Sequence, residues 1–538
     1  MTLRVIGVFL GLGAAVLTAQ LRIPDQTIQY RNGDWTTWPM LRVAASIDLD
    51  ERMVYAATTG GISRYDYYQN EWALPITEAD GLTGHAVSAI AYDPNSGYLW
   101  AATEAGVNCR MPGSEAWRFL DVDLGTVNEI GIGDRFVWFR TAGGLMRTDR
   151  PGDWTGPAAE QESVDDRVVW KGGKGRGVTP PALFMNHPFL FTPPDVIQDA
   201  EFRRRTVTAS ADDGFHSEWI ATDGLGIGRA DRRTFRLDLL PFGLFMPDVK
   251  AMAADGNGLW IGGFHGGEAE GGITYWDMAK DEWRYYEARY INGLRSDQVT
   301  SISPDTDCVW FGTLDGLVRY DSQTGYWNAF TVQRNLWSNE IHILAPGDSI
   351  LWVGTDMGLN RVSLPDLTID KVRDGRIDQR AVYDLEDDGE NVWIAAERGA
   401  FRLNKKEGSI ESLPGYPGLS AVEAWAVSVW KDEVWFATDD GVEMLNRSTG
   451  EWTGFSRRLY PTGGVLNVIA ADSDVVWVGT DEGVLKYLKS ENRWRRFTKA
   501  DGLPHDSVRW IIPDGEYVWF GSGGGLTRFL WDTPYRKD

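Results

Sequence analysis

VWFGTLDGLVRYD, residues 309–321, is the stretch of sequence that decides the fold. Close copies of it follow as LWVGTDMGLNRV (351–362), VWFATDDGVEML (434–445) and VWVGTDEGVLKY (476–487). Each copy has a Trp among apolar residues, then a small residue, a Thr or Ser, a short turn with Gly, and a second apolar run. Such self-similarity at a fixed spacing is the signature of a repeat protein.

The Trp of each copy, which we call the anchor, gives the period of the repeat. Consecutive anchors from Trp310 to Trp519 are 41 or 42 residues apart. The interval of 81 residues between Trp138 and Trp219 is close to two periods, so we expect a degenerate copy between them. The anchors are Tyr55, Trp100, Trp138, Trp219, Trp260, Trp310, Trp352, Trp393, Trp435, Trp477 and Trp519.

The residues around the anchor predict four short strands in each period. A Gly six residues after most anchors, such as Gly316 and Gly358, indicates a hairpin with a positive φ angle. Further apolar or aromatic runs lie upstream of the anchor and sixteen or seventeen residues after it. Four strands in about 42 residues are typical of a propeller blade. We therefore expect an all-β fold of tandem β-propellers, with about 11 to 12 four-stranded blades in total.

The two ends of the repeat array suggest how the rings close. The last copy stops at its third strand (526–530), whereas the chain opens with an orphan strand at 34–38. We expect two six-bladed rings, a first propeller at 30–277 with an irregular segment at 151–205, and a second at 278–538. Residues 34–38 would then pair with 273–277, and residues 282–286 would complete the last blade. In the alternative, nested arrangement, residues 34–38 close the last blade.

The irregular segment 151–205 allows two interpretations. Its Pro residues do not fit a regular central strand, so it is either a distorted blade or a looped insertion that leaves a five-bladed ring.

These repeats resemble a known family. The DGL triplets at 80–82 and 501–503 and the W-x-G-T-x-x-G-L-x-R-Y pattern are similar to the two-component-regulator propeller repeat. The chain also resembles the double-propeller surface component of type IX secretion. The resemblance implies extracytoplasmic binding of a ligand or partner, in a sensor-like or assembly role. The chain differs from the sensors because it has neither a transmembrane helix nor a kinase region.

Composition and the N-terminus restrict the function further. A net charge of −24 and a pI of about 4.7 argue against nucleic-acid binding. The two Cys residues, 109 and 308, are too far apart in sequence for a zinc cluster, and we interpret both as small strand residues. Arg4 and the apolar run after it predict a signal peptide at residues 1–19, with an uncleaved anchor as the alternative. We expect a periplasmic or extracellular protein without a membrane span after cleavage.

Candidate ligand-binding residues lie in predicted turns on one face of the second ring. Four carboxylates each follow an anchor by four residues, and aromatic residues occupy neighbouring turns. Carboxylates beside aromatics suit a sugar or a cation, although Asp before Gly is also a favoured turn residue. The face candidates are Asp356, Glu397, Asp439, Asp481, Trp337, Tyr416, Tyr460 and His505. A Gly-rich loop adds possible hard metal ligands at His265, Glu268 and Glu270.

No catalytic motif accompanies these residues. The chain has six His and lacks the zinc-protease and hydrolase-elbow patterns. We expect a non-enzymatic propeller that binds a glycan or a protein, with no cofactor other than a possible Ca²⁺ ion. A membrane sensor or a secretion component could act with it in trans. A propeller lyase or hydrolase acting on a glycan or a small molecule is the alternative.

Overall fold

The computed structural model describes residues 30–31, 33–120, 125–149, 154–157, 167–172, 195–199, 202–264, 271–413, 423–456 and 464–536. Within these ranges the chain forms 46 strands in eleven antiparallel sheets. The described helices are single 3₁₀ turns, η1 (Glu78–Asp80), η2 (Ala288–Tyr290), η3 (Val332–Arg334) and η5 (Lys499–Asp501). No helix in the described ranges has the length and apolar character of a membrane span. The predicted signal peptide at 1–19 lies outside them.

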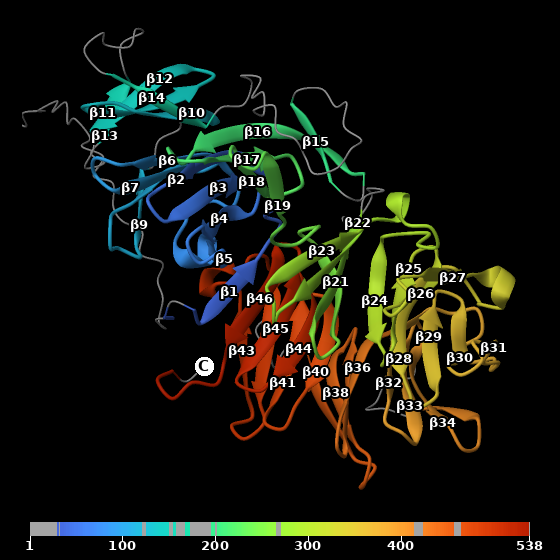
Figure 1. Ribbon diagram of the computed structural model, residues 1–538. Coiled ribbons are helices and arrows are strands. Elements are labelled where there is room, and N and C mark those ends of the chain that lie inside the picture. The colour runs from blue at the N-terminus through green and yellow to red at the C-terminus, as the bar shows by residue number, and fades with distance from the viewer. Residues whose placement is uncertain are drawn as a thin grey trace, which may run out of the picture.

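Seven sheets of the described chain form one ring, the seven-bladed ring, which occupies the lower part of Figure 1. Their strands are β20 (Val249–Ala254), β21 (Gly258–Phe264), β22 (Gly271–Asp277) and β23 (Glu282–Tyr286); β24 (Val299–Pro304), β25 (Cys308–Thr313), β26 (Gly316–Asp321) and β27 (Trp327–Phe330); β28 (Ile341–Pro346), β29 (Ile350–Thr355), β30 (Gly358–Ser363) and β31 (Ile369–Lys371); β32 (Val382–Asp387), β33 (Asn391–Ala396), β34 (Gly399–Asn404) and β35 (Ser409–Ser412); β36 (Ala424–Trp430), β37 (Glu433–Thr438), β38 (Gly441–Asn446) and β39 (Trp452–Ser456); β40 (Leu466–Ala471), β41 (Val475–Thr480), β42 (Gly483–Leu488) and β43 (Arg493–Phe497); and β44 (Val508–Asp514), β45 (Tyr517–Ser522), β46 (Gly525–Leu530) and β1 (Trp35–Trp38).

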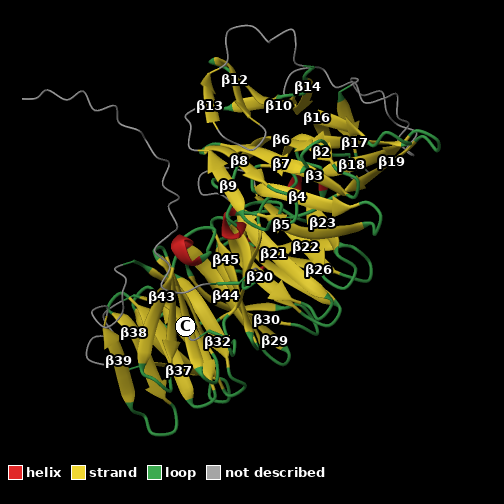
Figure 2. Ribbon diagram, turned by 90° about the vertical axis from the view of Figure 1, so that its left-hand side faces the viewer, coloured by secondary structure: helices red, strands yellow, loops and turns green. Residues whose placement is uncertain are grey.

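The other four sheets of the described chain form a second body, the four-sheet unit, which lies above the ring in Figure 2. Their strands are β2 (Ala44–Leu49), β3 (Met53–Thr58), β4 (Gly61–Asp66) and β5 (Glu71–Ile76); β6 (Val87–Asp93), β7 (Tyr98–Thr103), β8 (Gly106–Arg110) and β9 (Trp117–Leu120); β10 (Val127–Ile132), β11 (Phe136–Thr141), β12 (Gly144–Asp149) and β13 (Trp154–Pro157), with β14 (Val169–Gly172) added; and β16 (Arg204–Asp212), β17 (Ser217–Thr222), β18 (Ile227–Asp231) and β19 (Arg236–Leu240), with β15 (Val196–Gln198) added.

The sequence pattern that recurs in each repeat forms one hairpin of the blade. The anchor lies on the second strand, and Trp310, Trp393 and Trp477 are among the largest fully buried side chains. The Thr three residues after the anchor donates its hydroxyl to the carbonyl of the turn Gly, as Thr313 does to Gly316 over 2.8 Å. That Gly has a φ of +114°, a backbone conformation that side chains with a Cβ disfavour. The predicted hairpin is therefore confirmed.

The small residue two positions after the anchor lets neighbouring blades approach. A Cβ atom at Gly312 would lie 2.7 Å from Cγ2 of Ile341 on the next blade, well inside van der Waals contact. A Cβ atom at Gly521 would lie equally close to Cγ1 of Val249. Because Gly521 belongs to the last blade and Val249 to the first, this contact closes the ring of seven.

The way this ring closes corrects the predicted strand pairing. β1 pairs with β46, Trp35 opposite Phe529, and not with residues 273–277 (Figure 1). β23, predicted to complete the last blade, pairs with β22 instead. The nested alternative is correct, and a ring boundary at residue 277/278 is wrong. The prediction of two six-bladed rings is also wrong: the described chain forms one ring of seven blades and a unit of four sheets. The all-β class and the total of about eleven four-stranded blades are confirmed.

The chain end explains why β1 pairs there. The carboxylate of Asp34, directly before β1, accepts hydrogen bonds from Tyr535 and from the buried guanidinium of Arg536. The Leu530 amide also donates to the Asp34 carbonyl over 2.8 Å. The C-terminal segment thus holds β1 against β46.

The irregular segment contributes strands to its neighbours. β14 pairs with β10, and β15 pairs with β16, so each extends an adjacent sheet to five strands. Among the described residues of 151–205 no strand belongs to a separate sheet, which contradicts the predicted degenerate blade over that part. Both Cys residues are buried on strands and free, as predicted.

Candidate functional site

A bulge at the start of each innermost strand places one side chain in a special position. In all eleven described sheets the pairing register of that strand shifts near its start, around the second residue in ten of them and around the fifth, Thr208, in β16. Such a bulge leaves one residue unpaired and redirects its side chain. Where this residue is small and polar it bonds to the next blade, as the Thr300 hydroxyl does to the Ile341 carbonyl over 2.7 Å.

In the seven-bladed ring the bulge residue lies ten positions before each anchor. These residues are Lys250, Thr300, His342, Tyr383, Trp425, Asn467 and Arg509. Sequence reasoning missed them because their chemical types differ from blade to blade, although their fixed distance from the anchor was a usable signal.

Three consecutive bulge residues form a continuous set of rings, which we call the aromatic arc: His342, Tyr383 and Trp425. The Tyr383 and Trp425 rings are stacked, with centroids 4.7 Å apart and planes at 24°. The His342 and Tyr383 centroids are 5.7 Å apart. The arc therefore spans three adjacent blades and offers aromatic surface at one end of their inner strands.

The predicted carboxylates occupy equivalent turns next to these strands. The backbone N–H of Asp356 donates to the Glu340 carbonyl, that of Glu397 to Ala381, and that of Asp439 to Glu423. Each of these acceptors lies two residues before a bulge residue. Asp439 also accepts a 2.9 Å hydrogen bond from the indole of Trp425.

Acidic side chains of two neighbouring blades raise the pKa values of groups at this site. The pKa of Glu423 is raised by burial and by the carboxylates of Asp439 and Glu397. The pKa of Tyr383 is raised by burial and by the same three acids. The structure thus brings Glu397 and Asp439 to the aromatic arc, together with Glu423, which sequence reasoning did not select.

His342 and Asp356 continue the site towards the preceding blade. Burial lowers the pKa of His342, and Glu340 and Asp356 oppose that shift. The Nε2 atom of His342 and the Oδ1 atom of Asp356 are buried and have no hydrogen-bond partner among the described residues, although Nε2 of His342 lies 4.0 Å from Glu340 Oε1.

The far side of the ring carries basic bulge residues. Lys250 Nζ forms a 2.6 Å ion pair with Asp248, and its pKa is lowered by burial and partly by Arg509. The mouth of the ring, defined by its seven bulge residues, is therefore acidic and aromatic on one side and basic on the other.

The remaining predicted residues are not part of the aromatic arc. Trp337 packs against its own blade, with Gly358 beside its ring and the Lys371 ammonium 4.5 Å from its centroid. Asp481 occupies the equivalent turn of the next blade, where its backbone N–H donates to the Val465 carbonyl, and its side chain is exposed beside Gly464. Tyr416, Tyr460, His265, Glu268 and Glu270 lie outside the described residues.

His505 lines a different cavity, of about 270 Å³, between the ring and the four-sheet unit. Its other lining residues include His85, Glu78 and Lys499. Within the described ranges, no group of three or more His, Cys, Asp or Glu side chains is arranged to hold a metal ion.

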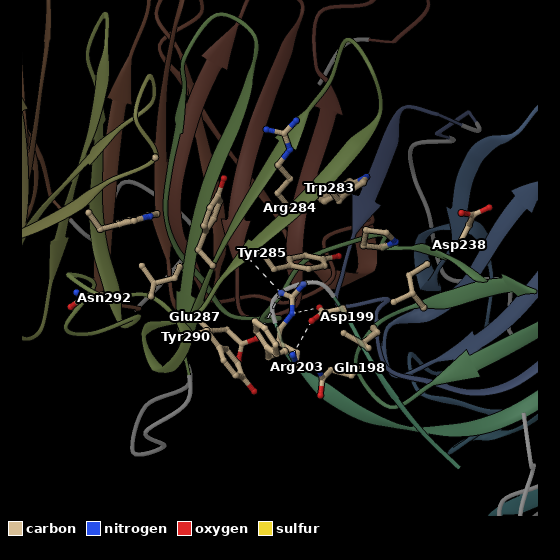
Figure 3. Close-up of a pocket in the computed structure, with 18 of the residues that line it drawn as sticks. Gln198, Asp199, Arg203, Asp238, Trp283, Arg284, Tyr285, Glu287, Tyr290 and Asn292 are labelled. Carbon is tan, nitrogen blue, oxygen red and sulfur yellow. Dashed lines mark hydrogen bonds and ion pairs between the residues drawn. The ribbon is translucent and has the colours of Figure 1, made fainter. Parts of the chain in front are cut away.

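A larger cleft, the inter-unit cleft, lies between β19 of the four-sheet unit and β23 of the ring (Figure 3). Its volume is about 900 Å³, and seven aromatic residues are among those that line it. Arg203, one of its lining residues, forms ion pairs with Asp199 at 2.5 Å and with Glu287 at 3.8 Å. Sequence reasoning missed this cleft because it joins segments from two separate bodies.

Comparison with known proteins supports the fold. No protein-family model and no curated protein matches the sequence. Among solved structures the chain is similar to PorZ, an essential surface component of the type IX secretion system of Porphyromonas gingivalis, with a TM-score of 0.65 and 14% identity over 93% of this chain and 87% of PorZ. It is also matched to the extracellular domain of the hybrid two-component system BT3049 of B. thetaiotaomicron, with a TM-score of 0.44 and 18% identity over 91% of this chain and 62% of that one. The similarity to PorZ thus confirms the propeller fold that the resemblance of the repeats implied.

Proposed function

We propose that this chain is an exported, non-enzymatic binding protein that presents the mouth of its seven-bladed ring to a ligand. The stacked pair of Tyr383 and Trp425 beside Glu397, Glu423 and Asp439 is the observation that carries this proposal. Concave sites with aromatic surface and a few convergent polar groups are the usual places for small ligands. Export is supported by the predicted signal peptide and by the surface location of PorZ, the protein of similar fold.

The chemistry of the aromatic arc favours a hydroxyl-rich ligand, such as a glycan, or a polar segment of a partner protein. A sugar ring has an apolar face that can pack on an indole or a phenol, and hydroxyls on its rim that can donate hydrogen bonds to carboxylates. The same carboxylates attract cations, and calcium therefore belongs in the test. The role we propose is that of a sensor-like or assembly component working with a separate partner.

Calorimetry with neutral and acidic oligosaccharides and with calcium tests this proposal. Trp425→Ala removes half of the stacked pair, and Asp439→Asn removes a charge while keeping the turn, since Asn tolerates turn conformations as well as Asp. Both variants should weaken binding about tenfold or more, which corresponds to 1.4 kcal/mol. Tyr68→Ala, at an exposed aromatic of the four-sheet unit, is the matched control.

The outcomes are distinct. Absence of any binding heat with the native chain, or equal binding by all variants, would contradict the mouth as a ligand site. An enzymatic role, in which Glu423 acts as a general acid, is tested by incubating the same oligosaccharides with the chain. Turnover that is lost in Glu423→Gln would replace the binding proposal.

A further inference from the structure

The inter-unit cleft is bordered by two strand edges rather than by two sheet faces. Four consecutive residues of the four-sheet unit line it, Arg236 to Leu239, and so do five of the ring, Trp283 to Glu287. Successive side chains of a strand point to opposite faces, so a run of consecutive residues can line a cavity only along the strand edge. β19 and β23 are each the last strand of their sheet, and in the described chain each pairs on one side only.

Backbone groups of β23 face this cleft. The Tyr285 carbonyl accepts a 3.5 Å hydrogen bond from Nη1 of Arg203, which lies on the opposite wall (Figure 3). Because backbone groups alternate in direction along a strand, the N–H of Tyr285 and both backbone groups of Trp283 point the same way. An open edge of this kind is a template for another strand.

Exposed aromatic side chains stand at the entrance of the cleft. Phe202 is 66% exposed and Tyr326 is 77% exposed, and both are among its lining residues. Phe202 has a φ of +65°, a left-handed conformation that is uncommon for residues other than Gly. It is held there because Asp199 accepts hydrogen bonds from the Phe202 amide and from the Arg203 amide. Strain of this kind that displays an apolar ring to solvent is typical of a binding surface.

The charges of the cleft balance. Its lining contains three Arg and three acidic residues, and two of the Arg residues are paired within it, Arg203 with Asp199 and Glu287, and Arg236 with Asp238 at 2.8 Å. Such a lining selects neither an anion nor a cation. A neutral backbone with apolar side chains fits it better.

We propose that the inter-unit cleft receives an extended segment of a partner protein, which pairs as an added strand with the free edge of β23. The five residues of β23 provide an edge of about 17 Å, enough for a segment of about five residues. Side chains at alternate positions of the segment pack on Leu237, Leu239 and the entrance aromatics, and its backbone bonds to Trp283 and Tyr285. Strand addition of this type takes affinity from main-chain hydrogen bonds and specificity from alternate side chains.

Selection from a library of random dodecapeptides displayed on phage, with the full chain as bait, tests this proposal. The cleft variant combines Phe202→Asn, which keeps the left-handed backbone, with Tyr326→Ser. The matched control combines Phe215→Asn with Tyr68→Ser, two exposed aromatics that do not line the cleft. Synthetic peptides from the selection should bind the native chain and the control equally, and the cleft variant about tenfold more weakly or worse.

Backbone pairing has a separate signature. N-methylation of the peptide should reduce binding at every second position and have little effect at the positions between, because only alternate amides face β23. Hydrogen exchange at the Trp283 and Tyr285 amides should slow when the peptide binds. Trp425→Ala in the mouth should leave peptide binding unchanged, so this proposal and the proposed function fail independently.

Four results would overturn strand addition: no recovered peptide, equal binding by the cleft variant, N-methylation effects without the two-residue alternation, or oligosaccharide binding that the cleft variant abolishes.

Discussion

Replacing Trp35 by Ala should open the seven-bladed ring at its last blade, whose strand β46 lies about 490 residues away from Trp35 in sequence. Trp35 is 6% exposed, and its ring stacks on Phe529 with centroids 3.9 Å apart. It also meets Phe497 of the preceding blade at 6.0 Å. Its indole nitrogen has no hydrogen-bond partner in the described part of the chain, so the expected loss is one of apolar packing.

The expected cost follows from this packing. Truncation of a buried Trp to Ala costs about 3–5 kcal/mol. We expect the whole of this free energy to be lost from the closure of the last blade. The population of the state in which β44, β45 and β46 are open should then rise roughly a hundredfold to several thousandfold, because each 1.4 kcal/mol is a factor of ten.

Native-state hydrogen exchange measures this change strand by strand. Amides of β45 and β46 should lose protection by that factor, whereas those of β17 and β18 in the four-sheet unit keep theirs. Tyr68→Ala, a 70% exposed aromatic, should change neither set. Loss of protection confined to β20–β23 would refute the reasoning, because it would place the closing contact of β1 on that blade.

Three further predictions concern stability. Burial raises the pKa of Glu386 to about 7, so the folded protein keeps a proton that the unfolded chain releases near pH 4.5; this contribution to stability is complete below that pH and is lost as the pH rises through 7. The Glu386→Gln side chain stays neutral at every pH. In urea unfolding, the free energy of unfolding of this variant should exceed that of the native chain by on the order of 3 kcal/mol at about pH 8 and equal it at about pH 4. Equal values at both pH values would exclude a buried acid at this position. Gly312→Val should cost about 1–3 kcal/mol in thermal unfolding, because its Cβ would meet Ile341 of the next blade, and an unchanged midpoint would contradict the close approach. Arg42→Met should lower the free energy of unfolding by about 1.5–3 kcal/mol, because the buried guanidinium donates to the Gly224 and Phe245 carbonyls and joins the four-sheet unit to the ring. Small-angle X-ray scattering of the variant should show a larger radius of gyration than that of the native chain.

Part of the candidate site could be predicted from the sequence. The turn carboxylates Glu397 and Asp439 were predictable because the repeat fixes their place in the blade, and a turn is a local structure. The aromatic arc was not, since His342, Tyr383 and Trp425 share a position but no chemical type. Their proximity arises only when three blades stand side by side, which no short stretch of sequence encodes.

The sequence by itself determined the blade. The anchor Trp, the Thr that bonds to the turn and the Gly with positive φ act within a few residues of one another, so their spacing specifies four strands wherever the repeat occurs. Only the tertiary structure decided the ring. The orphan strand at 34–38 could serve either open sheet edge, because backbone hydrogen bonds are the same on both. The choice depends on the stack of Trp35 on Phe529 and the buried pair of Asp34 with Arg536, contacts between chain ends about 500 residues apart, whose free energy becomes available only when the ring is complete.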